Sequence, residues 1–217
     1  MMMEHGWFTR FNWIYLFGLI PSALFSARML IQWFLSEKTK KVVSPVIYWQ
    51  LSLVASFLMF IYGWLRGDFA IVFGQLFSYY IYIWNLNVLN QWKKINVALR
   101  SVFLLTPVIV ISMLSITNCN SISHLWSNIS YGLLLFGTAG QIVFAFRFVY
   151  QWRYSRKYHK SILPVGFWII SIIGSICNLI YGIIRPDWIL VLNHGPGFFT
   201  YLRNLYIIRK NRQKQID

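Results

Sequence analysis

Two pairs of polar residues stand inside apolar stretches of this chain, and both pairs have the spacing of about one helical turn. Arg28 and Gln32 lie in RMLIQWFLSEK, and Arg147 and Gln151 lie in RFVYQWRYSRK. Residues four apart share one face of a helix, so we expect each Gln beside its Arg. Two guanidinium groups close together would bind an anion, and their planar fork fits phosphate or pyrophosphate. The alternative is that each Arg extends to the lipid headgroups.

Further hydrogen-bonding side chains complete a candidate binding site. Asn85 and Asn204 have a second interpretation, because amides also join helices within membranes. His194 either titrates or packs as a neutral ring. The candidate substrate-binding residues are Arg28, Gln32, Tyr62, Tyr82, Asn85, Arg147, Gln151, Tyr181, His194, Tyr201 and Asn204.

No residue pattern in the sequence indicates catalysis. It contains no nucleophile with its base, no metal-ligand spacing, no phosphate-binding loop and no nucleotide-binding fold. Cys119 and Cys177 have neither redox nor ligand spacing. We therefore predict no catalytic residue, no metal and no cofactor. The 217 residues also hold no polar segment long enough for a sugar-nucleotide glycosyltransferase domain.

The composition predicts the elements that position these side chains. Hydrophobic residues make up 58% of the chain and charged residues 12%, about half the charged share of a soluble domain. Apolar runs of about 20 residues recur, and this length spans a bilayer. We expect an all-α polytopic membrane protein. Its seven transmembrane helices are predicted at 11–35, 45–65, 69–90, 101–117, 127–152, 164–184 and 187–207.

A shift of 119 residues aligns the first three predicted helices with the last three without a gap. It places Arg28 on Arg147, and about a third of about 74 aligned positions are identical. Such a register indicates an internal duplication. The unmatched fourth helix lies in a linker, 91–126. It restores the orientation, so the three-helix repeats 11–90 and 127–207 are expected to run parallel around an axis along the membrane normal.

The 20 Lys and Arg outnumber the 5 Asp and Glu, for a formal charge of +15. A nucleic-acid partner would explain such a charge. However, the basic residues fall in short segments between apolar runs, so membrane orientation explains them better. Most lie on one side, at 38–41, 93–100, 153–160 and in the tail 208–217. That side is predicted to be cytoplasmic and the N-terminus periplasmic, with the first apolar run retained because no signal cleavage site follows it.

The two repeats differ most in their third helix. Gln75 in the first copy becomes His194 in the second, within the segment 193–197. The Gly-Pro-Gly in that segment predicts a break in the seventh helix that exposes backbone groups beside the candidate binding site. The short turns Arg-Gly-Asp at 66–68 and Arg-Pro-Asp at 185–187 are expected to be closed by ion pairs on the external side.

The pattern ARMLIQWFLSEK…SPVIYWQLS…YGWLRGDFAIVFGQ…IYIWNL resembles the lipid A biosynthesis N-terminal domain family. FRFVYQWRYSRK…LPVGFWIIS…YGIIRPDWILVLNHGPGFFTYLRNL resembles it again, and the two copies cover about 150 of the 217 residues. The family takes its name from occurring beside, or fused to, lipid-A-disaccharide synthase. This resemblance implies lipid A assembly in a bacterial inner membrane. The three-plus-one-plus-three plan also resembles the SWEET and PQ-loop transporters in architecture.

Two main hypotheses follow for the function. The first is a transporter or flippase-like protein that binds membrane lipids, namely a phosphorylated glycolipid or polyprenyl-phosphate sugar. The second is a non-transporting membrane subunit that recruits a glycosyltransferase of lipid A synthesis through its basic loops. A third reading, a glycosyltransferase in its own right, lacks a catalytic set, and no nucleic-acid partner is expected.

Overall fold

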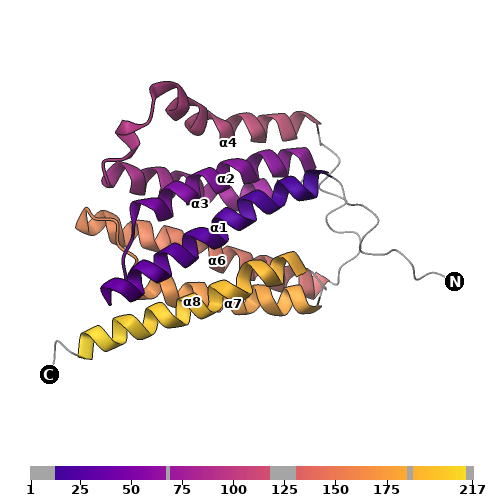
Figure 1. Cartoon of the computed structure of the whole chain (residues 1–217). Coiled ribbons are helices and arrows are strands. Elements are labelled where there is room, and N and C mark those ends of the chain that lie inside the picture. Colours follow the sequence, from indigo (N-terminus) through magenta and orange to yellow (C-terminus); the bar gives the residue numbers. More distant parts are fainter. Residues whose placement is uncertain (1–12, 67–68, 118–130, 185–187, 214–217) are drawn as a thin grey trace.

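The computed structural model describes residues 13–66, 69–117, 131–184 and 188–213. All regular structure in these ranges is helical, so the all-α prediction is confirmed (Figure 1). The seven long helices are α1 (Trp13–Thr39), α2 (Val46–Arg66), α3 (Phe69–Val88), α4 (Val97–Thr117), α6 (Tyr131–Tyr158), α7 (Val165–Ile184) and α8 (Trp188–Gln213), and a 3₁₀ turn, η1 (Trp92–Lys94), precedes α4.

Helices α1 and α6 end in the same way, at residues that lie 119 apart. Lys40 and His159 follow these helices with φ angles of 54° and 49°, the left-handed conformation that often terminates a helix. Helices α6 and α8 end at residues 158 and 213 rather than at the predicted 152 and 207. Both extensions are rich in Arg and Lys, which favour helix and interact well with the C-terminal dipole.

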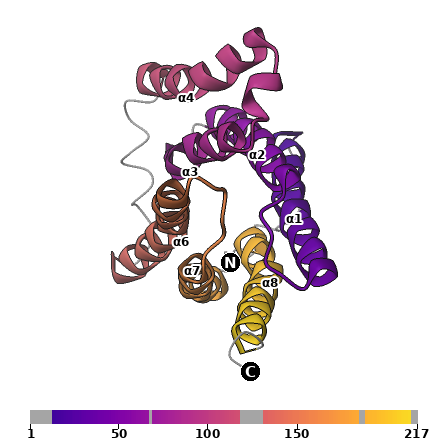
Figure 2. The ribbon, with the colours of Figure 1, turned by 90° about the vertical axis from the view of Figure 1, so that its left-hand side faces the viewer.

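Six of the helices form a closed ring in which each helix packs against two neighbours. α1 lies between α2 and α8, α3 lies between α2 and α6, and α7 lies between α6 and α8. Figure 2 looks along the bundle and shows α4 outside this ring, where it contacts α2 and α3. The two sets of three helices therefore meet at two places, α1 with α8 and α3 with α6.

One end of the bundle collects most of the basic residues. The loops 40–45, 89–96 and 159–164 and the C-terminal end of α8 all lie at this end, on the left of Figure 1. We call it the basic end. Its Lys and Arg side chains include Lys38, Lys40, Lys41, Lys93, Lys94, Arg153, Arg156, Lys157, Lys160, Arg209 and Lys210.

One glycine in each set of three helices allows two of the helices to pack closely. A Cβ atom added at Gly18 in α1 would lie 2.6 Å from the ring of Tyr62 in α2. A Cβ atom added at Gly137 in α6 would lie 2.6 Å from the ring of Tyr181 in α7. Small residues of this kind let helices approach closely inside membranes. The two pairs again lie 119 residues apart, so both halves use the same packing.

Besides an apolar core that includes Trp49 and Trp168, the helices bury many polar side chains and expose many large apolar ones, which is unusual for a soluble domain. Gln32 and Gln151 are fully buried, whereas Phe199 is 73% exposed and Ile183 is 68% exposed. The bundle therefore has the character of a membrane-associated protein. Three of the described helical segments are long and apolar enough to cross a membrane, namely Leu16–Thr39, Val46–Leu65 and Val165–Ile184. The crossing of all seven helices, and their membrane orientation, remain predictions.

The predicted break in the seventh helix is wrong. Helix α8 continues from Trp188 to Gln213 with Pro196 in its interior. Proline has no N–H, so only the carbonyl of Leu192, one turn earlier, loses its helical partner. The packing of α8 between α1 and α7 supports the remaining turns, as neighbouring helices do for prolines within membranes.

Some sequence predictions fall outside the described residues. They concern the ion-paired turns around 67–68 and 185–187, Cys119, the span ends at 11–12 and 127–130, the linker segment 118–126 and the tail residues 214–217.

Candidate ligand-binding site

The guanidinium group of Arg28 is buried among α1, α2 and α3. The residue is only 4% exposed. Nη1 donates hydrogen bonds to Ser52 Oγ at 2.6 Å and to Tyr82 Oη at 3.2 Å. The guanidinium carbon lies 4.5 Å from the centre of the Phe25 ring. Arg28 therefore points into the bundle and does not extend to the surface.

Arg147 has similar surroundings in the second half. It is also 4% exposed, and its Nη1 donates to Tyr201 Oη at 3.2 Å. Its guanidinium carbon lies 3.4 Å from the centre of the Phe144 ring. Tyr201 and Phe144 stand 119 residues after Tyr82 and Phe25, so the duplication is preserved in the contacts of each arginine.

Both guanidinium groups face one shared ring, that of Phe148 in α6. The guanidinium carbon of Arg28 lies 5.6 Å from the centre of this ring, and that of Arg147 lies 4.7 Å from it. The two cations are therefore within about 10 Å of each other. Phe148 also packs edge-on against Tyr82 in α3, with ring centres 5.1 Å apart. The two predicted anion-binding residues thus lie together where α3 meets α6.

Neither arginine has a carboxylate partner in the described part of the chain. The one acidic side chain there is Glu37, which accepts a hydrogen bond from Arg203 Nη2 at 3.2 Å and lies 3.6 Å from Lys40 Nζ. The Nε atoms of Arg28 and Arg147 are buried without an acceptor. A desolvated cation–π contact contributes about 2 kcal/mol or more, but it supplies no hydrogen-bond acceptor, and an uncompensated buried charge costs several kcal/mol. The two guanidinium groups therefore provide positive charge that an anionic ligand would neutralise.

The two glutamines join the halves of the ring. Gln32 in α1 and Asn204 in α8 exchange two hydrogen bonds, of 3.0 and 3.1 Å. Gln151 in α6 and Asn85 in α3 also exchange two, of 3.0 and 3.2 Å. Each glutamine therefore binds the asparagine of the other half, and the second interpretation of the asparagines, as links between helices, describes their contacts.

Two serines that the sequence analysis left out of the site extend these links to the loops. Ser36 Oγ accepts hydrogen bonds from the side-chain N–H of Gln32 at 2.9 Å and from the backbone N–H of Val43 at 3.2 Å. Ser155 receives the corresponding bonds from Gln151 at 2.8 Å and from the backbone of residue 162 at 3.0 Å. The signal was present in the sequence, because each Ser follows its Gln by four residues in both copies.

The halves are held together further at the basic end. Ser44 Oγ and Ser161 Oγ lie 2.9 Å apart. Asn211 Nδ2 donates to the carbonyl of Lys40 at 2.5 Å. Together with the Glu37–Arg203 ion pair, these bonds tie α1 to α8 and the two loops to each other. The polar links between the halves that the described residues provide are concentrated in this part of the bundle.

The remaining predicted site residues lie farther away. Tyr62 and Tyr181 pack against Gly18 and Gly137. Each of these glycines precedes the arginine of its own helix by ten residues, which is about 15 Å along the helix axis. The structure does not bring them to the guanidinium groups. His194 is close, because its ring centre lies 4.5 Å from that of Phe144. No three His, Cys, Asp or Glu side chains of the described residues gather as metal ligands would.

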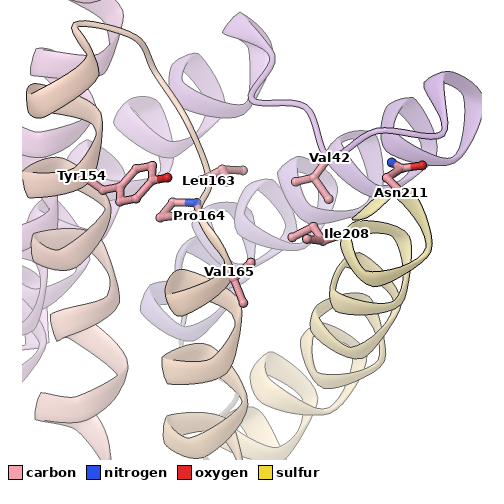
Figure 3. A pocket seen from close by; sticks show the side chains of 7 residues that line it. All are labelled: Val42, Tyr154, Leu163, Pro164, Val165, Ile208 and Asn211. Atoms are coloured by element: carbon pink, nitrogen blue, oxygen red, sulfur yellow. The ribbon is translucent and has the colours of Figure 1, made fainter. Parts of the chain in front are cut away.

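A surface pocket of about 250 Å³ opens at the basic end, where the loop after α1, the start of α7 and the end of α8 meet (Figure 3). An adjoining apolar pocket of about 460 Å³ shares two of its residues. Arg28 and Arg147 line neither pocket. The residues around the first are Val42, Tyr154, Leu163, Pro164, Val165, Ile208 and Asn211.

Comparison with protein families explains the duplicated contacts. The model of the Lipid A Biosynthesis N-terminal domain matches the chain twice, at residues 17–87 and 136–206. The chain belongs to the Lipid A Biosynthesis N-terminal domain family. The two matches begin and end 119 residues apart, which is the shift that relates the arginine contacts and the Gln–Asn pairs. The resemblance inferred from the sequence is therefore confirmed as two tandem copies, and the family associates the chain with lipid A biosynthesis.

Relatives of this family member are longer proteins. The chain is 30% identical over 209 residues to a lipid-A-disaccharide synthase of Chlamydia pneumoniae, a match that covers 92% of the chain and 34% of that protein. The corresponding protein of Chlamydia felis is 30% identical over 210 residues, covering 91% of the chain and 33% of its own length. The chain thus spans about a third of the length of these relatives. No solved structure matches it.

Proposed function

We propose that this protein binds a phosphorylated glycolipid or a polyprenyl-phosphate sugar of envelope synthesis between its two halves and moves it across the bacterial inner membrane. The observation that carries the proposal is the pair of buried arginines that share Phe148 and have no carboxylate partner in the described residues. A lipid phosphate would neutralise both charges, and a guanidinium fork recognises phosphate through paired hydrogen bonds.

The polar links between the halves support movement as part of the proposal. The Gln–Asn pairs and the contacts at the basic end close the bundle towards the predicted cytoplasmic side. Transport would require these links to open and allow the phosphate to reach the arginines from that side. Hydrogen bonds between amides in membranes contribute only about 0.6–2 kcal/mol each, which is small enough for reversible opening.

A transport assay tests this function directly. Purified protein is reconstituted into phosphatidylcholine vesicles that contain a fluorescent dodecyl phosphoglucose in both leaflets, and dithionite is added outside to quench accessible label. We expect quenching to pass beyond the outer-leaflet half with wild-type protein and to stop there with Arg28→Gln/Arg147→Gln. Quenching by wild-type protein that equals protein-free vesicles would rule out movement of this lipid class.

A second candidate function is a non-transporting subunit that recruits a lipid A glycosyltransferase. The relatives support this candidate, because they are named lipid-A-disaccharide synthases and are about three times as long as this chain. On this proposal, the basic end is the docking surface. Co-purification with a separately expressed lipid-A-disaccharide synthase tests it. Capture that disappears in Lys93→Gln/Lys94→Gln, but not in Arg28→Gln, would favour recruitment over transport.

A further inference from the structure

Three neighbouring side chains in the second half contain buried polar atoms without a hydrogen-bond partner among the described residues. The atoms concerned are Ser175 Oγ, Asn178 Oδ1 and Nδ2, and His194 Nδ1. Ser175 and Asn178 are fully buried and His194 is 5% exposed. Buried polar groups are almost always paired in folded proteins, so an unpaired set in one place requires an explanation.

These side chains belong to α7 and α8 and lie around Phe144 of α6. The Asn178 Oδ1 atom would be 3.3 Å from a Cβ added at Gly140, one turn before Phe144 on α6. A Cβ added at Gly174, next to Ser175 on α7, would lie 2.8 Å from Phe144 itself. The His194 ring lies 4.5 Å from the Phe144 ring between centres. All three groups therefore surround the same turn of α6.

Arg147 lies next to this group of polar side chains and connects it with the proposed phosphate site at Arg28 and Arg147. Its guanidinium carbon lies 3.4 Å from the centre of the Phe144 ring, the ring that His194 also contacts. The second half thus combines a cation with several uncharged donors and acceptors.

The first half lacks this feature at the corresponding positions. Ser56, the counterpart of Ser175, donates to Gln75 Oε1 at 2.9 Å, and Gln75 is the counterpart of His194. Met59 takes the place of Asn178 and offers no comparable donor. At these three positions, the first half therefore has no counterpart of the unpaired group in the second half.

We propose that Ser175, Asn178 and His194 bind the sugar of the phosphorylated lipid whose phosphate lies at Arg147. This rests on the proposed function, and it assigns sugar recognition to the second half alone. An amide supplies two donors and an acceptor, a hydroxyl supplies both, and a neutral imidazole supplies one of each. Such a set matches the hydroxyl groups of a sugar, and a site built to bond them discriminates strongly against a ligand that lacks them.

Two lipid phosphates, one with the sugar and one without it, test the assignment, because the difference in their phosphate charge is the same for wild type and every variant. Dodecyl phosphoglucose and dodecyl phosphate are titrated into the full chain in detergent, and the ratio of their dissociation constants is the readout. We expect wild-type protein to prefer the sugar-bearing probe at least tenfold. Asn178→Met and His194→Gln, which introduce the residues of the first half, should each reduce the preference below threefold and leave dodecyl phosphate binding unchanged.

Controls separate binding from packing. Ser56→Ala breaks the satisfied pair of the first half and should lower the melting temperature without changing the preference, and Ser175→Ala is a second variant of the site that removes a single hydroxyl. A preference that survives in all three second-half variants would overturn the assignment, as would a wild type without preference. Failure of the proposed function looks different, because dodecyl phosphate would then bind equally to wild type and to Arg28→Gln/Arg147→Gln.

Discussion

At the scale of single residues, Arg28 and Arg147 are surrounded by rings and hydroxyls in place of carboxylates. Each contacts a phenylalanine three residues earlier and a tyrosine hydroxyl from the third helix of its own half. Rings stabilise a cation through their faces but leave its hydrogen-bond donors free. The N–H groups that these contacts do not use could donate hydrogen bonds to a phosphate.

Replacing either arginine by lysine keeps the charge and removes the planar fork. We expect Arg28→Lys and Arg147→Lys each to weaken dodecyl phosphate binding ten- to a hundredfold, about 1.5–3 kcal/mol, the loss of one charge-assisted hydrogen bond. Calorimetric titration in detergent measures this change. Lys41→Gln at the exposed basic end is the control and should bind as wild type does. Lysine variants that bind equally well would show that charge alone is sensed.

The Gln32–Asn204 pair gives a second prediction for single residues. Gln32→Ala and Asn204→Ala should each lower the free energy of unfolding, and the double variant should lose less than the sum. A coupling of about 0.6–2 kcal/mol is expected, as for other amide pairs in membranes. A double-mutant cycle followed by denaturant unfolding in micelles measures it. Additive losses would mean that the two amides contribute independently.

The sequence predicted which polar residues are buried together better than it predicted their partners. Arg28, Arg147 and their glutamines were predictable, because a polar pair repeated inside apolar runs is expensive to maintain. The exchange of partners between halves was not, since the spacing of Gln32 and Asn204 along the chain contains no information on which helices meet. Tyr62 was placed in the site on its polar group alone, whereas its ring packs against Gly18.

At the scale of helices, close packing in α6 depends on Gly137 and not on Gly132. A Cβ at Gly137 would lie 2.6 Å from the Tyr181 ring, whereas one at Gly132 meets nothing within 4 Å. Gly137→Ala should therefore destabilise the protein by about 1–3 kcal/mol through overpacking. Gly132→Ala, on the same helix, should be neutral or stabilise by up to about 1 kcal/mol. Thermal unfolding of both variants decides, and equal melting temperatures would contradict this packing.

The helices themselves were predictable from the length of the apolar runs in the sequence. The residues at which the helices end were less predictable. Helix α8 shows why, since Gly-Pro-Gly is a strong break signal in isolation. In the folded chain only one backbone bond is lost at Pro196, and two neighbouring helices support the rest of α8. Tertiary packing therefore overrides the local signal at this position.

At the scale of the whole molecule, the basic end predicts orientation in the membrane. Single cysteines at Lys94 and Lys160 should react with an impermeant maleimide only after the inner membrane is opened, whereas a cysteine at Ser121, in the predicted external segment, should react from outside in spheroplasts. The background is a variant with Cys119 and Cys177 replaced by serine. Labelling of positions 94 and 121 from the same side would exclude the seven-span arrangement.

The central claim is that the two arginines share one anionic lipid. Native mass spectrometry of the protein released from mild detergent, followed by fragmentation of any retained lipid, tests it most directly. We expect wild-type protein to retain one phosphate-containing lipid per chain, and Arg28→Gln/Arg147→Gln, folded to the same extent by circular dichroism, to retain none. A wild-type protein without a phosphorylated lipid, or equal retention by the double variant, would contradict the claim.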